Sequence, residues 1–205
     1  MNKITNSFWL GMLSALFFTA LSIAAIVTQE ITIFYVIYVF WWDELIKVIF
    51  EASKLIFNRG QIEDVFSFKT MVGARMFMLF IYFVFIVLCF GLIIDWNFKE
   101  QISKNFDVFL FQNIFFNLSL ITFIGREVYV YANTYTSKVE AGNVFSRGAM
   151  TLHLSIILGL LLWAVSTNKI GSFMPEAFFK YSYIAAVVPF FIIKFIFDWW
   201  ELKSK

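Results

Sequence analysis

Six long apolar runs divide this sequence, and they limit its fold more than any other feature. They lie near residues 8–28, 31–57, 68–94, 106–125, 148–167 and 177–200. Each run is long enough to cross a hydrocarbon core of about 30 Å as a helix, which takes about 20 residues. The pattern predicts an all-α polytopic membrane protein, a bundle of six transmembrane helices that forms one integral membrane domain over residues 1–205.

The composition supports this class and excludes others. The chain is 61% hydrophobic and only 15% charged, so no soluble core is expected. A net charge of +2, with Lys and Arg scattered between apolar blocks, does not indicate nucleic-acid binding. The expected partners are therefore membrane lipid and other membrane proteins, including a second copy of this chain.

The positive charges predict the orientation in the membrane. If the N-terminus is cytoplasmic, twelve of the 16 Lys and Arg residues fall in cytoplasmic segments and four fall outside. Cytoplasmic segments of multi-pass proteins carry such an excess. No clear small-x-small cleavage site follows the first run, so we expect it to be retained as a helix. The prediction is a multi-pass protein of the inner (cytoplasmic) membrane with both termini in the cytoplasm.

Five charged residues interrupt the second apolar run without ending it. At about 100° per residue they share one arc of about 100° on a helix. They are Asp43, Glu44, Lys47, Glu51 and Lys54. An unpaired charge at the centre of a membrane helix costs at least about 3 kcal/mol. We therefore expect ion pairs at i,i+4 between Asp43 and Lys47 and between Lys47 and Glu51.

Trp41 and Trp42 permit a second interpretation of the same run. Adjacent tryptophans suit the headgroup layer, so the helix would leave the membrane there and continue along its surface. The 12 residues from Ile31 to Trp42 span only about 18 Å, which is too short to cross a bilayer without thinning it. The first interpretation buries the charges within the bundle, and the second exposes them to water.

Further polar residues reach the same cytoplasmic leaflet from other predicted helices. They are Arg75, Arg147, His153 and Asp198. Together with the charged arc they would line a polar cavity open to the cytoplasm. Each also has a simpler role, because arginines near helix ends extend to headgroups and a single histidine commonly forms a hydrogen bond between helices. Asn113 and Asn117 in the fourth run are likewise expected to bond to a neighbouring helix.

The chain lacks the ligand sets of common metal and cofactor sites. His153 and Cys89 are the only residues of their types, so neither a bis-histidine haem nor a zinc site is expected, and no cofactor is predicted. No Gly-x-Ser-x-Gly element or phosphate-binding glycine loop occurs. Glu44 and His153 leave one enzymatic hypothesis, an intramembrane acid and base.

Three blocks of the sequence resemble a known pattern. They are YVFWWDELIKVIFEASKLIF (38–57), SRGAMTLHLSIILG (146–159) and FIFDWWELK (195–203). Together they resemble an uncharacterised family of prokaryotic polytopic membrane proteins, catalogued as a domain of unknown function. The matching residues are Trp42, Glu44, Lys54, Arg147, His153, Gly159 and Asp198. The family often has Pro-Tyr before the Arg, where this chain has Phe145-Ser146. The resemblance implies a shared six-helix fold and draws attention to these residues, but it implies no activity.

Three functional hypotheses follow. The preferred one is a membrane protein whose cytoplasm-facing polar cluster binds or transports a small ligand or ion. The second is a non-catalytic subunit or scaffold of a membrane complex, in which the charged arc contacts a partner helix. The third is an intramembrane enzyme that uses Glu44 and His153.

Overall fold

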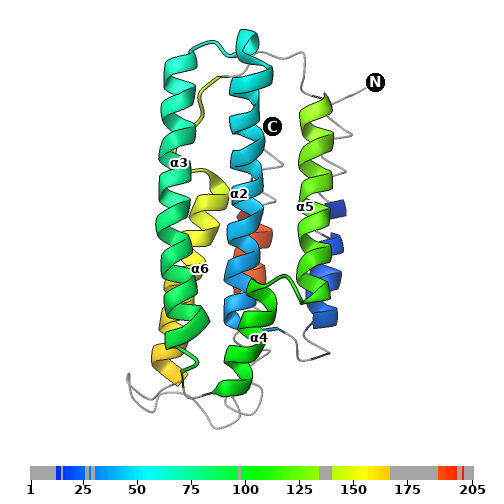
Figure 1. Cartoon of the computed structure of the whole chain (residues 1–205), viewed down its shortest axis with the longest axis vertical. Helices are drawn as coiled ribbons and strands as arrows, with labels where there is room; N and C mark the ends of the chain where they lie inside the picture. The colour runs from blue at the N-terminus through cyan, green and yellow to red at the C-terminus, as the bar shows by residue number, and fades with distance from the viewer. Residues whose placement is uncertain are drawn as a thin grey trace.

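The computed structural model of this chain describes residues 13–14, 16–25, 28, 31–96, 98–133, 140–166, 189–197 and 200. These residues are mostly helical, which confirms the all-α class for the described part (Figure 1). The first helical segment is Leu16–Ala25. It is followed by α2 (Ile33–Phe57), η1 (Arg59–Gln61), α3 (Val65–Phe85), the π-helix η2 (Ile86–Ile93), α4 (Lys99–Phe109), α5 (Ile114–Asn133) and α6 (Arg147–Ser166). Residues 189–197 are also helical.

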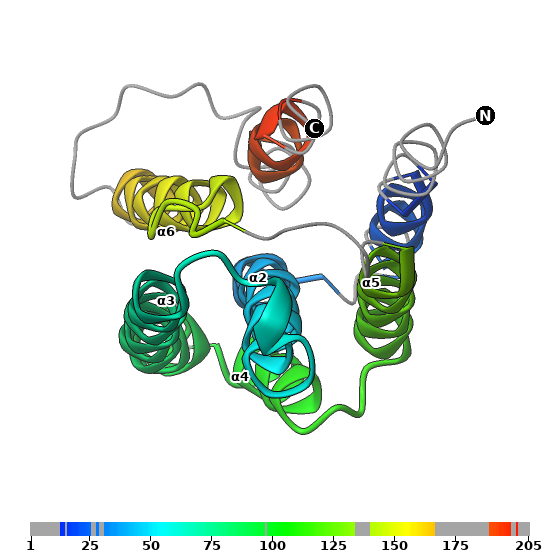
Figure 2. The ribbon, with the colours of Figure 1, turned by 90° about the horizontal axis from the view of Figure 1, so that it is seen from above.

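The helix α2 is the central helix of the bundle. Seen from above, it lies in the middle, with α3, α5 and α6 packed around it (Figure 2). Every residue from Phe34 to Trp41 is buried, as expected of a helix that is apolar on all sides. Thr32 caps its start by accepting a hydrogen bond from the Tyr35 amide at 3.0 Å.

The second helix does not bend at its two tryptophans. It continues as one α-helix from Ile33 to Phe57. Asp43 and Glu44, which follow Trp42 directly, are only 3% and 2% exposed. The interpretation that exposes these charges to water is therefore wrong for both carboxylates, which lie within the bundle.

The fourth apolar run is divided differently from the prediction. A single helix was expected over 106–125, but α4 ends at Phe109 and α5 begins at Ile114. Phe111 adopts a positive φ of 59° between them, a conformation in which an α-helix cannot continue. The helix α5 extends to Asn133 and carries Arg126 and Glu127.

The two asparagines near this break form hydrogen bonds with nearby backbone groups. Asn113 accepts a hydrogen bond from the Phe116 amide at 3.0 Å, and so caps the start of α5. Asn117 Nδ2 donates to the Phe111 carbonyl at 2.7 Å. The prediction that both amides bond to a neighbouring helix is wrong, because the turn before α5 takes these hydrogen bonds.

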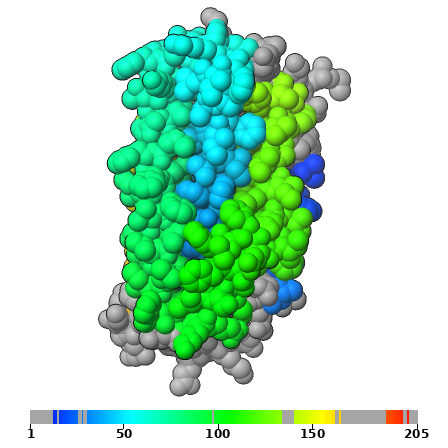
Figure 3. Space-filling model, viewed as in Figure 1, coloured from blue at the N-terminus to red at the C-terminus, as the bar shows by residue number. Residues whose placement is uncertain are grey.

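Two helices in the described part are long and apolar enough to cross a membrane, judged by length and composition alone. They are Val65–Ile93, which joins α3 and η2, and Lys99–Asn133, which contains the break at Phe111. Large apolar side chains are exposed along α3 and η2, which lie on the left in Figure 3. They include Phe66, Phe77, Phe80, Ile81, Phe85 and Leu88. This surface is compatible with a lipid environment. The predicted runs 8–28 and 177–200 lie only partly within the described residues.

Asp64 caps the start of α3. Its Oδ1 accepts hydrogen bonds from the amides of Phe66 and Ser67 at 3.0 and 3.2 Å, and its Oδ2 accepts from the Ser67 hydroxyl at 2.6 Å. The bonds from Ser67 lower the pKa of this exposed carboxyl below its ordinary value of 3.8. The charged form of Asp64 is therefore favoured by the fold.

This cap predicts an acid-dependent loss of stability. Because the pKa is lower in the folded than in the unfolded chain, the contribution of Asp64 is present above about pH 4 and is lost as the pH falls through the folded pKa. Asp64→Asn keeps a capping oxygen but has no charge to titrate. The melting temperature in detergent should therefore drop less for Asp64→Asn than for the wild type between pH 6 and pH 3. Equal drops would contradict the assignment.

Candidate functional site

Two adjacent buried carboxylates occupy the middle of α2. Asp43 and Glu44 lie about 100° apart on the helix and contact different partners. Asp43 faces α5 and the last helical segment, residues 189–197. Glu44 faces the start of α6. One turn of α2 therefore links three other parts of the bundle through charged groups.

Asp43 is paired with three cations from three elements. Its Oδ1 lies 2.6 Å from Arg126 Nη2 on α5, and its Oδ2 lies 2.6 Å from Lys194 Nζ. Lys47 Nζ lies 3.9 Å from the same Oδ2, which confirms the expected i,i+4 pair. A buried carboxylate needs such compensation, because removal from water costs several kcal/mol per ion.

Arg126 and Lys194 are site residues that the sequence did not indicate. The predicted run over 106–125 ends just before Arg126, but α5 continues through it. The buried residues Phe116, Leu120 and Phe123 recur at helical spacing, and extending that spacing by three residues reaches Arg126. That periodicity was the available signal. For Lys194, nothing local in the sequence indicates a partner 151 residues away.

Glu44 lies against the first turn of α6. Its Oε1 accepts a hydrogen bond from the Ser146 hydroxyl, and Ser146 Oγ caps α6 by accepting from the Ala149 amide at 2.9 Å. A Cβ added at Gly148 would collide with the Glu44 carboxyl group. The carboxylate thus sits at the positive end of the α6 dipole, which favours a negative charge.

One oxygen of Glu44 is buried without a hydrogen-bond partner among the described residues. This atom is Oε2, and the residue as a whole is 2% exposed. The cations of Lys47 and Arg75 act on this carboxylate through longer-range electrostatics. Buried acceptors are normally hydrogen-bonded, so an unpartnered one calls for an explanation.

Arg75 joins α3 to α2 and to the segment before α6. Its Nη1 lies 2.5 Å from Glu51 Oε2, and its Nε donates to the Asn143 carbonyl at 3.1 Å. Glu51, which was predicted to pair with Lys47, therefore has Arg75 as a partner. Asn143 belongs to the non-helical residues 140–146. In Figure 1 α6 begins beside the middle of α2, so this segment passes along the upper half of α2.

Two predicted site residues lie elsewhere. Arg147 Nη1 donates to the Trp200 carbonyl at 3.0 Å, and its guanidinium lies 5.0 Å from the Trp200 ring centroid. His153 is exposed, and its Nδ1 lies 3.0 Å from the Tyr82 hydroxyl. His153 follows Gly148 by five residues, which is about 140° around α6 from the face that meets Glu44. The geometry does not bring Glu44 and His153 together as an acid and base, and Asp198 lies outside the described residues.

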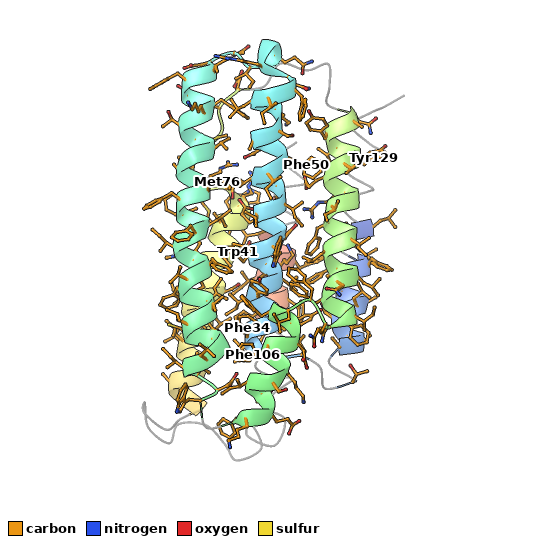
Figure 4. All side chains as sticks on the ribbon, in the orientation of Figure 1. Phe34, Trp41, Phe50, Met76, Phe106 and Tyr129 are labelled. Atoms are coloured by element: carbon orange, nitrogen blue, oxygen red, sulfur yellow. The ribbon has the colours of Figure 1, made fainter. Side chains whose placement is uncertain are left out.

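Two cavities in the described part are apolar. One of about 220 Å³ lies between α2 and α3 and is lined by Trp41, Leu45, Met76, Leu79, Phe80 and Phe83; Trp41 and Met76 are labelled in Figure 4. Another of about 50 Å³ is lined by Phe34, Val87, Gly91, Leu92, Asn105, Phe106 and Phe109. Neither includes a charged residue. The charged side chains described above pack against one another as an ion-pair network.

Comparison of the chain with protein-family models, with curated proteins and with solved structures finds no match. The interpretation of the site therefore depends on its own geometry.

Proposed function

We propose that this chain is a multi-pass inner membrane protein that binds or transports a small ligand or ion at the buried carboxylates Asp43 and Glu44. In this proposal six helices cross the membrane, both termini are cytoplasmic, and the fold is shared with the prokaryotic family that the sequence resembles. The apolar composition and the two helices that are long and apolar enough to cross a membrane support the membrane location.

The observation that carries the proposal is the contrast between the two carboxylates. Ionisable residues inside membrane bundles are costly and are retained mainly where a function needs them. Among the described residues, Asp43 is compensated by three cations, whereas Glu44 has one buried oxygen without a partner. That oxygen is the acceptor that a proton or a small cation would take.

Occupation of Glu44 would act directly on α6. A bound proton removes the negative charge that the α6 dipole favours and weakens the bond from Ser146. The contact between α2 and the start of α6 therefore differs in strength between the two states of Glu44. A ligand can shift a conformational equilibrium only when its free energy of interaction differs between the two conformations.

Proton movement in reconstituted vesicles tests this function. A pH gradient is imposed on proteoliposomes that contain a pH-sensitive dye, and its decay is followed with and without candidate small cations. We expect the wild type to dissipate the gradient faster than empty vesicles, and Glu44→Gln to slow this decay at least about tenfold, since Gln cannot take up a proton at pH 7.

Glu100→Gln is the matched control. Glu100 pairs with Lys104 on α4 and its side chain is 80% exposed, so we expect this variant to behave like the wild type. A Glu44→Gln protein that is as fast as the wild type would overturn the role of Glu44. A wild type no faster than empty vesicles would overturn transport by this chain alone.

A wild type that dissipates the gradient no faster than empty vesicles would favour a non-catalytic subunit of a membrane complex. The observation for that role is His153, which is exposed on α6 beside Tyr82 of α3. A polar side chain on the outside of a membrane helix is best accommodated by another protein helix.

A further inference from the structure

We infer that the aromatic rings and the carboxylate around Lys194 Nζ form a binding site for primary alkylammonium ions, which the chain fills with its own lysine. The site, here called the ammonium cage, consists of the rings of Phe18, Phe40 and Phe123 and the carboxylate of Asp43. Lys194 Nζ lies 5.9, 5.3 and 5.7 Å from the three ring centroids and 2.6 Å from Asp43 Oδ2. The lysine is 6% exposed.

These groups are the ones that recognise an ammonium ion. The faces of aromatic rings attract a cation through their quadrupoles, most strongly where water is excluded. Phe18, Phe40 and Phe123 are each no more than 3% exposed. The carboxylate adds one charge-assisted hydrogen bond, which requires an N–H group on the ligand. A buried aromatic box with one carboxylate oxygen therefore fits a primary ammonium carried on an alkyl chain.

Other cations fit this cage less well. Calcium takes six to eight oxygen ligands and magnesium an octahedron of them, whereas the cage offers one carboxylate oxygen. The second oxygen of Asp43 is held by Arg126 at 2.6 Å, and Lys47 Nζ lies 3.9 Å from the first. A quaternary ammonium would keep the contacts with the rings but lose the hydrogen bond to Asp43. The chemistry thus selects a monovalent cation with N–H donors.

The walls of the cage come from segments other than the one that supplies its occupant. Phe18 belongs to Leu16–Ala25, Phe40 to α2 and Phe123 to α5. Their rings contact one another, with centroids 5.4 Å apart for Phe18 and Phe123 and 6.2 Å apart for Phe18 and Phe40. Lys194 belongs to residues 189–197, which also place Phe191 against Phe18 and bury Phe190 in the core. The cage is therefore built largely without the segment that fills it, and a free amine can compete with Lys194.

This inference names a ligand class for the proposed binding function and rests on it for any role in transport. It also implies that Lys194, within residues 189–197, competes with an external amine for the cage. An alkylammonium ion that enters the cage must displace Lys194 from Asp43, and so release the contact that holds this segment to α2.

Lys194→Ala with n-propylammonium tests the cage directly. The substitution removes three methylene groups and the ammonium beyond Cβ, which together correspond to n-propylammonium. We expect millimolar n-propylammonium to raise the melting temperature of the detergent-solubilised full-length variant by about 3–6 °C in a saturable manner. Equal concentrations of n-propanol or sodium chloride should not do so, and the wild type should show a smaller shift, because the ligand must first displace Lys194.

Phe40→Leu in the Lys194→Ala background is the specificity control. It removes the nearest ring, and we expect the apparent affinity for n-propylammonium to fall about tenfold. If Lys194→Ala does not fold alone, the readout becomes the yield of folded protein after refolding with n-propylammonium relative to n-propanol. Equal effects of n-propylammonium and n-propanol in either format would overturn the inference.

The outcome is independent of the vesicle experiment on Glu44. A saturable shift with n-propylammonium, together with no proton movement in vesicles, would reject transport and keep the cage. Proton movement without any shift would reject the cage and keep the proposed function.

Discussion

Asp43→Asn is expected to destabilise the folded chain by about 3–5 kcal/mol, because it leaves buried cations without their counter-ion. The side chains of Arg126 and Lys194 are only 12% and 7% exposed, so water cannot replace the lost carboxylate. Lys47 lies in the same group, at 3.9 Å. The change in unfolding free energy can be measured by reversible denaturation in mixed detergent micelles.

A second substitution identifies the cause of this loss. Lys194→Met in the Asp43→Asn background removes one stranded cation and keeps most of the side-chain volume. We expect the double variant to recover more than half of the lost unfolding free energy. A double-mutant cycle would then show energetic coupling between positions 43 and 194. A destabilisation by Asp43→Asn of less than about 1 kcal/mol, the size expected for a solvent-exposed pair, would show that the network is not buried as described.

Gly159→Ala is expected to destabilise the bundle by about 1–3 kcal/mol through overpacking. A Cβ at this position of α6 would lie 2.5 Å from Phe90 Cε1 and 3.1 Å from Ile37 Cδ1. Phe90 and Ile37 are at most 1% exposed, so neither side chain can move into open space. Gly159 thus permits the close approach of α6 to η2 and α2.

Gly73→Ala is the matched control for this prediction. Nothing lies within 4 Å of a Cβ built on Gly73 in α3, and alanine is favoured over glycine in a helix by about 1 kcal/mol. Gly73→Ala should therefore be neutral or stabilising in the same denaturation assay. Phe90→Leu should relieve part of the penalty of Gly159→Ala. If Gly159→Ala matched Gly73→Ala, the tight contact with Phe90 would be disproved.

The helices themselves could be predicted from local sequence. The run predicted over 31–57 appears as α2, and the run over 68–94 appears as α3 with η2. The pair of Asp43 and Lys47 was predictable for the same reason, since residues four apart share one face of a helix. These features depend on groups close together in the chain, so hydrophobic length and helical spacing are sufficient to predict them.

The break between α4 and α5 was harder to predict. It occurs at Phe111, a residue type that seldom adopts a positive φ, and it lies inside an apolar stretch with no glycine or proline. The start of α5 could therefore not be obtained from composition.

The sequence by itself determined that the chain forms apolar helices and that α2 carries charges on one arc. Only the tertiary structure decided which groups those charges contact. Asp43 meets Arg126 and Lys194, which are 83 and 151 residues away, and Glu44 meets Ser146, 102 residues away. The physical reason is that helical periodicity is a property of neighbouring residues, whereas a buried charge is satisfied by whichever distant segment packs against it.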